Sequence, residues 1–530
     1  MIPAFVRTCL GDVCKKDKAE FQRLCQEIID CVSTIQFVRH CQLTSGGHVL
    51  LTLKRADVTS TVLNNVMSKT DQYGKSSGGL DAQCVLLNPS VLLSSHDGDQ
   101  DHLNLDQLRT VLICEHSKEL LDANGVVVKS TPDDASHNTV HESELRNIQT
   151  RQEICHLFSP SCNTSSKTDT SGTDKDLTRK AKELYKVLKS SKYVIQTDES
   201  ADSFDDETGN HGNQVINSIQ SCSCDNECSC GGDSDLNCDV VLDVQKFLKD
   251  NEQFAATGNY KSKVTLSSSL LKDVAKLDPV AKNAENADMV LHVTSCRRRF
   301  IQQQVSTVWQ MTSTSPLTRK QFYLTHGLVS VHNDEAKIQD GFNAVDLLRI
   351  REKQLRESYI LKYGDKVEGH GWDISIRQMA VATIKLEILS AAPNSEVKIN
   401  LCETSREFRQ ATFVLYNCAR LAKLFQNFEE NVQKGVYPAL PPVNEVDFNL
   451  LRDQAEWELT LNFIVAFPSI VKDAVPTTTT KGSQNVTIHT NKICSFLFNL
   501  IHKFSSYYGR VHILGESRQH LFPQCLQDFI

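Results

Sequence analysis

A strand–helix–strand pattern at residues 82–128 places the strongest constraint on the fold of this chain. The apolar run at 84–87 predicts a strand, residues 104–124 have helical periodicity, and Gly125 stands where a helix cap belongs before a second apolar run at 126–128. Two strands joined by a helix at this spacing form a βαβ unit, in which the strands lie parallel. The sequence therefore predicts an α/β domain on a parallel sheet.

The segments on either side of this unit predict further structure. A strand at 49–53 between two helical stretches is typical of a small α+β unit. Later in the chain, strands at 289–293 and 322–331 enclose a helix at 299–311. We expect these later elements to extend the parallel sheet.

From Trp372 onward the pattern changes to four amphipathic helical stretches, which predict a bundle with a shared core. The third stretch is expected to end at Pro468 and the last at Gly509, because proline breaks a helix and glycine caps one. The expected domains are a small N-terminal α+β region at 1–74, a parallel-sheet domain at 82–128 and 261–370, a largely disordered acidic insertion at 129–260, and a helical domain at 371–530.

The expected insertion is rich in Ser, Thr, Asp, Asn and Gly and poor in aromatic residues, so little burial offsets the entropy of ordering it. Between Gln196 and Gln245 it has twelve carboxylates and no Lys or Arg, which leaves a net charge of +4 on the rest of a chain whose total is −8. Charge therefore allows an RNA partner, and it equally allows an ordinary enzyme with a solvated acidic loop.

One helix, at 174–193, is expected inside the insertion. It carries basic residues beside a modest apolar stripe, and two interpretations fit this pattern. The helix either contacts RNA or a protein partner, or it is a solvated face of an amphipathic helix. The basic residues are Lys175, Arg179, Lys180, Lys182, Lys186, Lys189 and Lys192.

Composition excludes several classes of protein. The chain has 530 residues, 40% of them hydrophobic, without an apolar run near the ~20 residues that a membrane-spanning helix needs. Its first residues lack the apolar stretch of a secretory signal. Its 19 cysteines are an odd number in a chain far too long for a disulfide-stapled miniprotein, which favours reduced thiols. We therefore expect a cytoplasmic protein without a membrane partner.

The sequence holds few signatures of metal binding or catalysis. Four cysteines, Cys222, Cys224, Cys228 and Cys230, are close enough in sequence for a zinc site, but they lack the paired Cys-x2-Cys spacing, and we expect no metal there. A glycine-rich phosphate loop, a GxSxG turn and an HExxH helix are all missing. We therefore expect neither a cofactor nor a catalytic centre.

Aromatic and basic residues gather near the end of the chain in a pattern that suits unpaired RNA bases, because rings stack bases and cations neutralise phosphates. A structural interpretation is also open: Tyr416 in the core with its hydroxyl bonded to backbone, and Arg420 paired with Glu445 or Asp447. The candidate RNA-binding residues are Tyr416, Arg420, Lys423, Tyr507, Tyr508 and Arg510.

These residues lie in segments that resemble a known family. Residues 413–421, FVLYNCARL, look like the helix that opens the anticodon-binding DALR domain of arginyl-tRNA synthetases, and FSSYYGRVHILGE at 504–516 resembles its closing helix and turn. Residues 108–110 and 120–126 are similar to the segment that follows the nucleotide-binding signature of the same enzymes. The resemblance implies a class I synthetase-like, Rossmann-type domain joined to an all-α DALR bundle.

The departures from the family concern catalysis. Class I synthetases have the sequence HxGH directly before this leucine–arginine segment, and its imidazoles stabilise the transition state of adenylate formation. The corresponding positions here are Asn104, Leu105, Asp106 and Gln107, and the KMSK-like signature is reduced to Lys337 and the residues after it. Without the histidines, and with a carboxylate near the expected phosphates, adenylation is expected to be lost.

A degenerate synthetase core with a retained DALR bundle is similar to a family of synthetase-like adaptors, and the runs at 296–304, 413–425 and 504–516 carry this likeness. The resemblance implies a noncatalytic subunit that binds particular arginine tRNAs. It also implies a methyltransferase-like partner that forms 3-methylcytidine in the anticodon loop. Two rivals stay open: an arginyl-tRNA synthetase with aberrant signatures, and a scaffold that has lost RNA binding.

Overall fold

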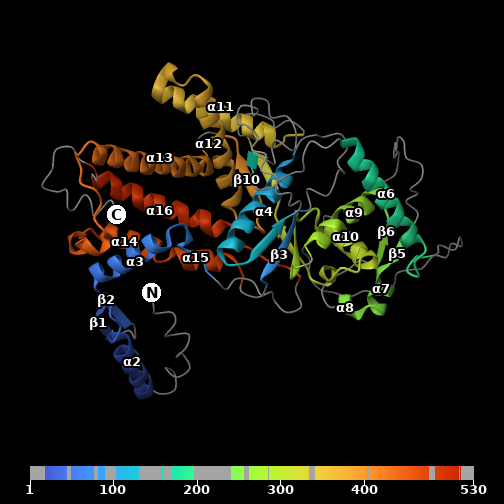
Figure 1. Ribbon diagram of the computed structural model, residues 1–530, viewed down its shortest axis with the longest axis horizontal. Coiled ribbons are helices and arrows are strands. Elements are labelled where there is room, and N and C mark those ends of the chain that lie inside the picture. Colours follow the sequence, from blue (N-terminus) through green and yellow to red (C-terminus); the bar gives the residue numbers. More distant parts are fainter. Residues whose placement is uncertain are drawn as a thin grey trace.

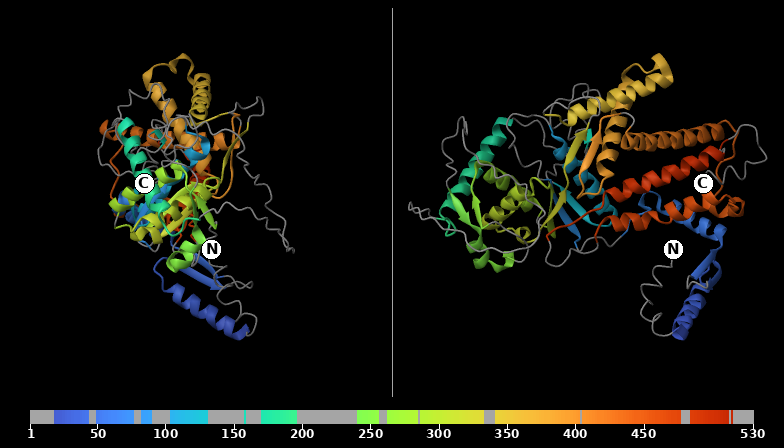
Figure 2. Two further views of the ribbon diagram at one scale, coloured as in Figure 1. Left: turned by 90° about the vertical axis from the view of Figure 1, so that its right-hand side faces the viewer. Right: turned by 180° about the vertical axis from the view of Figure 1, so that it is seen from behind.

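The computed structural model describes residues 18–43, 49–76, 82–89, 103–130, 157–158, 170–195, 240–255, 262–284, 286–332, 341–402, 405–476, 484–511 and 514. The N-terminal helices and the C-terminal bundle lie toward one end of the long axis, and a group of helices with a short hairpin lies at the other (Figure 1, Figure 2). Within the described ranges, every helix is too short or too polar to span a bilayer.

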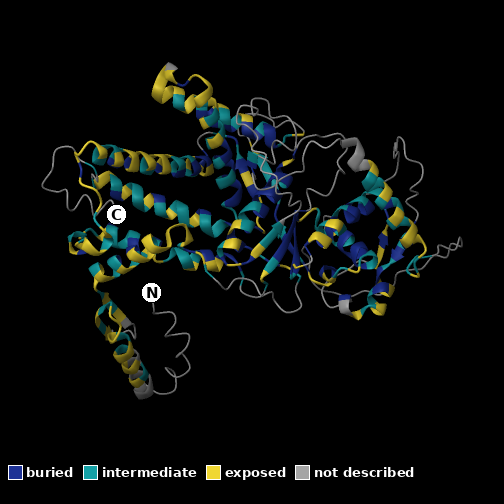
Figure 3. Cartoon of the chain, in the orientation of Figure 1, coloured by how far each residue is buried: buried dark blue, intermediate teal, exposed yellow. Residues whose placement is uncertain are grey.

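The central sheet has four parallel strands in the order β4-β3-β7-β8. Strands β3 and β7 are buried almost throughout, as in sheets that are covered on both faces (Figure 3). Val85 and Leu291 belong to the core on one face, whereas Leu86 and Val290 belong to the core on the other. The strands are β3 Cys84–Pro89, β4 Val127–Ser130, β7 Met289–Ser295 and β8 Gln321–His326.

Helix α4, Leu105–Ala123, joins β3 to the parallel strand β4 and confirms the predicted βαβ unit. The helix begins with a capping box, in which the side chains of Asn104 and Gln107 each accept the other residue's backbone N–H. Just after its end, Gly125 has a φ of 77°, which glycine adopts without strain. Local sequence signals therefore set both ends of this helix.

The second face of the sheet is covered by α9 and α10, with α6 packed on α9 through Ala181 and Leu188. A short antiparallel hairpin, β5 with β6, completes this layer. The expectation of a largely disordered insertion with one helix at 174–193 is therefore wrong for its described part, because 240–255 also folds. The bounds are α6 Thr170–Lys189, β5 Val241–Asp243, α7 Val244–Asp250, α8 Glu252–Ala255, β6 Lys263–Thr265, α9 Ser268–Asn283 and α10 Arg299–Thr312.

The strand expected at 322–331 is divided in the structure. Strand β8 ends at His326, and β9, Val329–His332, pairs with β10, Val397–Asn400, in a separate parallel pair. Gly327 lies between β8 and β9, where an added Cβ would come within 2.3 Å of the Ser395 carbonyl oxygen. A glycine at this position therefore lets the chain leave the sheet and pass close to the neighbouring loop.

The C-terminal half is helical, and α13 packs on α16 around Leu424, Phe428 and Tyr507. Two expected helix ends are wrong. Pro468 lies in the first turn of α15, where its missing N–H costs little, and Gly509 lies inside the last turn of α16. The bounds are α11 Ala344–Tyr363, α12 His370–Leu389, α13 Arg406–Gln433, α14 Gln454–Leu459, a π-helical turn at Thr460–Ile464, α15 Phe467–Ala474 and α16 Asn491–Arg510.

The N-terminal region packs against the far end of this bundle. Arg55 donates a hydrogen bond to Gln454 at 2.8 Å and lies over the Trp457 ring. The Tyr73 hydroxyl donates to the Ile464 carbonyl oxygen at 2.8 Å. The region consists of α2 Lys18–Ser33, β1 Val38–Leu43, β2 Val49–Leu53 and α3 Arg55–Lys69, with β1 and β2 antiparallel.

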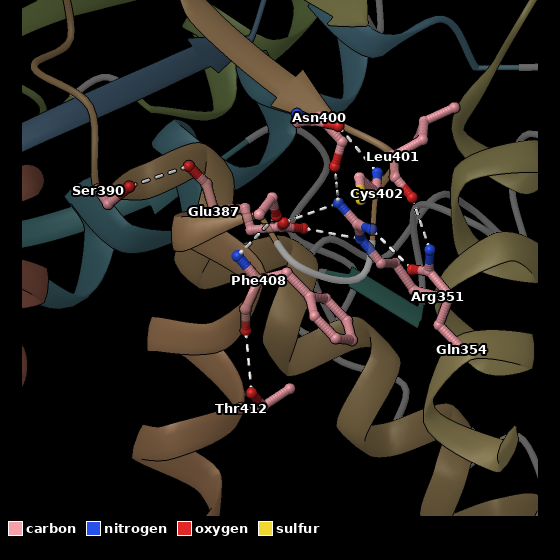
Figure 4. A network of polar contacts seen from close by, with 10 residues as sticks. Arg351, Gln354, Glu387, Ser390, Asn400, Leu401, Cys402, Phe408 and Thr412 are labelled. Atoms are coloured by element: carbon pink, nitrogen blue, oxygen red, sulfur yellow. Dashed lines mark hydrogen bonds and ion pairs between the residues drawn. The ribbon is translucent and has the colours of Figure 1, made fainter. Parts of the chain in front are cut away.

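A buried ion pair joins the sheet domain to the bundle (Figure 4). The Arg351 guanidinium on α11 donates to both carboxylate oxygens of Glu387 on α12, at 2.8 and 3.1 Å, and both side chains are almost fully buried. Arg351 also donates to Gln354 and to the Asn400 carbonyl oxygen, and it lies over the Phe408 ring of α13. Burial raises the pKa of Glu387, and the charge of Arg351 opposes this shift.

Removal of one partner of this pair is expected to be more harmful than removal of both. Arg351→Met leaves a buried carboxylate without its cation and should lower the free energy of unfolding by about 3–5 kcal/mol. Arg351→Met/Glu387→Leu should lose less, because no charge stays buried. Urea unfolding followed by circular dichroism measures both, with the exposed Arg349→Met as control. A double variant as unstable as the single one would contradict this account.

Candidate functional site

The positions of the degenerate synthetase signature are occupied by hydrogen bonds within the chain. Asn104 and Gln107 are joined in the capping box of α4, with donor–acceptor distances of 2.9 and 3.0 Å. The Asp106 carboxylate accepts the backbone N–H of Val329 at 2.7 Å. Lys337 lies outside the described residues. The described signature residues therefore stabilise the start of α4 and its contact with β9.

Arg109 fills the space behind this helix start. Its guanidinium is fully buried and lies among five backbone carbonyl oxygens in two loops, the one after β8 and the one before β10. Burial lowers the pKa of Arg109 to about 10, so the side chain stays charged at neutral pH. The acceptors are Gly327 at 2.9 Å, Leu328 at 3.3 Å, Ser395 at 2.6 Å, Ala392 at 3.0 Å and Pro393 at 3.2 Å.

Two buried histidines beside this region are neutral. The Nδ1 atom of His326 lies 2.8 Å from the Gly327 carbonyl oxygen, which assigns the proton to Nδ1 and lets Nε2 accept from the Thr110 hydroxyl at 2.8 Å. His292 lies between Asn88 and Gln321. Burial lowers the pKa of each imidazole to about 4. At neutral pH neither ring supplies a positive charge for a phosphate.

A second group of residues, on α11, α13 and α16, has a different character. The Arg420 guanidinium lies between the rings of Tyr416 and Tyr508, 4.6 and 4.7 Å from their centroids. It donates to the Tyr416 hydroxyl at 2.7 Å and to the Ser505 hydroxyl at 3.4 Å. Lys362 lies over the Tyr416 ring at 5.6 Å. We call Lys362, Tyr416, Arg420, Ser505 and Tyr508 the tyrosine–arginine cluster.

The structure brings together some of the predicted RNA-binding residues and separates others. Arg420 contacts both Tyr416 and Tyr508, and Lys423 lies exposed about one turn beyond Arg420 on α13. Tyr507 is different: its ring is in the bundle core and its hydroxyl donates to Glu456, so the expectation that it faces RNA is wrong. Arg510 forms an ion pair with Asp453 at 3.4 Å, on the exposed end of α16.

The structural interpretation of Tyr416 and Arg420 does not hold either. Tyr416 is 47% exposed, and its hydroxyl accepts from Arg420 rather than from backbone. Arg420 bonds to Tyr416 and Ser505 in place of the expected Glu445 or Asp447. Sequence reasoning missed Lys362, because it lies on a helix that precedes α13 and no local pattern links the two.

Metal binding finds no support in the described residues. Cys222, Cys224, Cys228 and Cys230 all lie outside them. Within them, His, Cys, Asp and Glu side chains form no group of three that could hold an ion. Free thiols in this part of the chain include Cys31, Cys41, Cys84, Cys296, Cys418 and Cys494.

Comparison with known proteins places the cluster in a known domain. The family model of the DALR anticodon binding domain matches residues 414–526, which include four of the five cluster residues. Over 448 residues, 83% of this chain and 72% of the relative, the sequence is 30% identical to DALR anticodon-binding domain-containing protein 3 of Danio rerio. The chain belongs to the DALR anticodon-binding domain-containing protein 3 family.

Other members and a solved structure agree with this assignment. The family member of Mus musculus is 37% identical over 239 residues, 44% of this chain and 43% of that protein. The fold resembles that of Thermus thermophilus arginyl-tRNA synthetase, with a TM-score of 0.51 and 13% identity over 98% of this chain and 91% of the other. This confirms the predicted fold class, a synthetase-like α/β domain with a helical DALR domain.

The neutral histidines predict how stability depends on pH in this DALR-family protein. Between pH 6.5 and 4 the unfolded chain binds protons that the buried His292 and His326 do not, so stability falls as the pH drops through this window. Each ring should contribute about 3 kcal/mol to this loss. Urea unfolding across the window should give a shallower pH dependence for His292→Gln. An unchanged slope, with exposed His370→Gln as control, would refute the assignment.

Proposed function

We propose that this chain is a noncatalytic tRNA-binding adaptor whose bundle binds the anticodon arm through the tyrosine–arginine cluster. One observation carries the proposal. Arg420 is held between Tyr416 and Tyr508 inside the segment that matches a DALR anticodon binding domain. Family membership supports it, because the relatives are named for this domain.

The cluster has the chemistry that an unpaired loop of RNA requires. Tyr416 offers an exposed ring on which a base can stack, a contact of about 1–3 kcal/mol per base. Arg420 and Lys362 supply the cations that RNA phosphates need. Arg420 has five N–H donors, and its two hydrogen bonds to Tyr416 and Ser505 hold the guanidinium plane in place. A positioned arginine loses less entropy on binding than a mobile one.

The sheet domain supports the noncatalytic part of the proposal. Asn104, Asp106 and Gln107 bond to backbone at the start of α4, and Arg109 bonds to five carbonyl oxygens behind it. A nucleotide at this position would have to break these bonds and meet the charge of Asp106. The domain then serves as a support for the RNA-binding bundle.

The family resemblance of the sequence supports a more specific proposal for the substrate and the partner. The RNA would be a subset of arginine tRNAs, and the bundle would present the anticodon loop to a methyltransferase-like enzyme that forms 3-methylcytidine. The methyl donor and the chemistry would belong to that partner. The cytosol is the proposed site of action, which free thiols such as those of Cys31, Cys296 and Cys418 support.

Arg420→Ala is expected to weaken binding of arginine tRNA by about 10- to 100-fold, because it removes the cation and releases both rings. Fluorescence anisotropy with a labelled arginine tRNA transcript measures the change. Lys353→Ala, an exposed lysine on α11, should bind like the wild type. Equal affinity for arginine tRNAs and other tRNAs would contradict the proposed specificity, and an unaffected Arg420→Ala would contradict the cluster as the site.

Cells that lack the protein are expected to lose 3-methylcytidine from arginine tRNAs while other tRNAs keep it. Sequencing of modified tRNA, with re-expression of wild type and of Arg420→Ala, measures this effect. The rival synthetase function predicts arginine-dependent pyrophosphate exchange by the purified chain, and any such turnover would overturn the noncatalytic assignment. Unchanged 3-methylcytidine would overturn the recruitment.

A further inference from the structure

A second basic surface lies outside the DALR-matched residues. Three consecutive arginines, Arg297, Arg298 and Arg299, follow the carboxyl end of β7 and lead into α10. Phe300 and Ile301 come next and are 38% and 40% exposed. We call residues 296–301 the arginine turn. Large exposed apolar side chains beside clustered guanidinium groups are an unusual combination on a surface, and they suit a ligand that is both charged and flat.

The positive charge of the turn is not neutralised by the described part of the protein. Arg299 donates to the neutral side-chain amide of Asn485 at 2.8 Å, which holds this guanidinium in place. Within the described residues, none of the three arginines forms an ion pair. The start of α10 adds a partial positive charge, because its cap residue Arg298 makes no side-chain capping bond.

A described carboxylate within electrostatic reach of the turn does little to change this balance. Asp273 on α9 is 4% exposed and lies within electrostatic reach of Arg298. Burial raises the pKa of Asp273 to about 7, so this carboxyl is only partly ionised at neutral pH. Asp273 therefore offsets little of the positive charge of Arg298, and like charges clustered on a surface are typical of a site that binds an anion.

We propose that the arginine turn is a second RNA contact, which binds the phosphates of an unpaired segment and stacks a base on Phe300. Arginine forks bind phosphate in a bidentate manner, and a ring between cations is the usual arrangement for single-stranded nucleic acid. A small nucleotide is the poorer occupant, because the neighbouring start of α4 is closed by its own hydrogen bonds. This inference rests on the proposed function.

The position of the turn separates it from the tyrosine–arginine cluster. Helix α10 packs through Val305 and Val308 on one face of the sheet, whereas α12, which leads into the bundle, packs on the other through Ile384 and Ile388. Figure 1 accordingly has the sheet between α10 and the bundle. One RNA that touches both sites must extend beyond its anticodon arm, so the turn should contact a part of the tRNA that an isolated anticodon stem–loop lacks.

The experiment compares two RNAs by fluorescence anisotropy: a full-length arginine tRNA transcript and the anticodon stem–loop cut from it. Arg297→Ala/Arg298→Ala should weaken binding of the full tRNA about tenfold and reduce the slope of log affinity against log salt by roughly 1–2. Its affinity for the stem–loop should equal that of the wild type. Arg349→Ala/Lys353→Ala on α11 is the control that removes two exposed basic residues elsewhere, and circular dichroism checks that each variant is folded.

The outcomes separate this inference from the proposed function. Wild-type binding of the full tRNA by Arg297→Ala/Arg298→Ala would overturn the second contact, as would an equal loss for both RNAs. Loss of a protein partner with unchanged RNA binding would also overturn it, and would make the turn a protein-docking surface. Arg420→Ala should weaken both RNAs. If Arg420→Ala binds the full tRNA normally and the double variant does not, the result supports the arginine turn as an RNA contact and contradicts the tyrosine–arginine cluster as one.

Discussion

One buried guanidinium holds the centre of this fold together. Arg109 comes from the helix of the first βαβ unit, and its five carbonyl acceptors lie in loops more than 200 residues later in the chain. A buried cation without such partners would be strongly destabilising. The two loops must therefore keep their carbonyl oxygens within hydrogen-bond distance of the guanidinium. The loop after Gly327 and the loop that ends at Ser395 lead into β9 and β10. The pairing of β9 with β10 therefore depends on this interaction.

The residues at the degenerate signature positions, next to Arg109 in the sequence, are also bonded within the chain. In an active class I enzyme the start of this helix faces a nucleotide and keeps its polar groups available. Here Asn104, Asp106 and Gln107 are bonded within the chain, and the imidazoles of His292 and His326 are buried and neutral. The residues at the signature positions stabilise the helix start through these hydrogen bonds. A noncatalytic role is consistent with a core that remains well packed.

Much of the fold could be predicted from local patterns, since α4, β7, α10 and α16 all have clear periodicity and α4 also has a capping signal at each end. What could not be predicted depends on tertiary contacts. The break after His326 requires the close approach of Gly327 to a loop almost 70 residues later. Tyr507 and Tyr508 are adjacent, and a rotation of about 100° along the helix puts one ring in the core and the other beside Arg420. Sequence alone does not reveal that rotation.

The N-terminal region has a consequence for how the chain is made. Arg55 and Gln454, whose side chains are hydrogen-bonded, are 399 positions apart, and Tyr73 and Ile464 are 391 apart. During synthesis, helix α3 leaves the ribosome long before the surface that it covers exists. The apolar side of α3 therefore stays exposed, or is covered by a chaperone, until nearly the whole polypeptide has emerged. Docking of α3 and Tyr73 on the bundle is thus one of the last steps of folding, and slow translation would prolong the exposure.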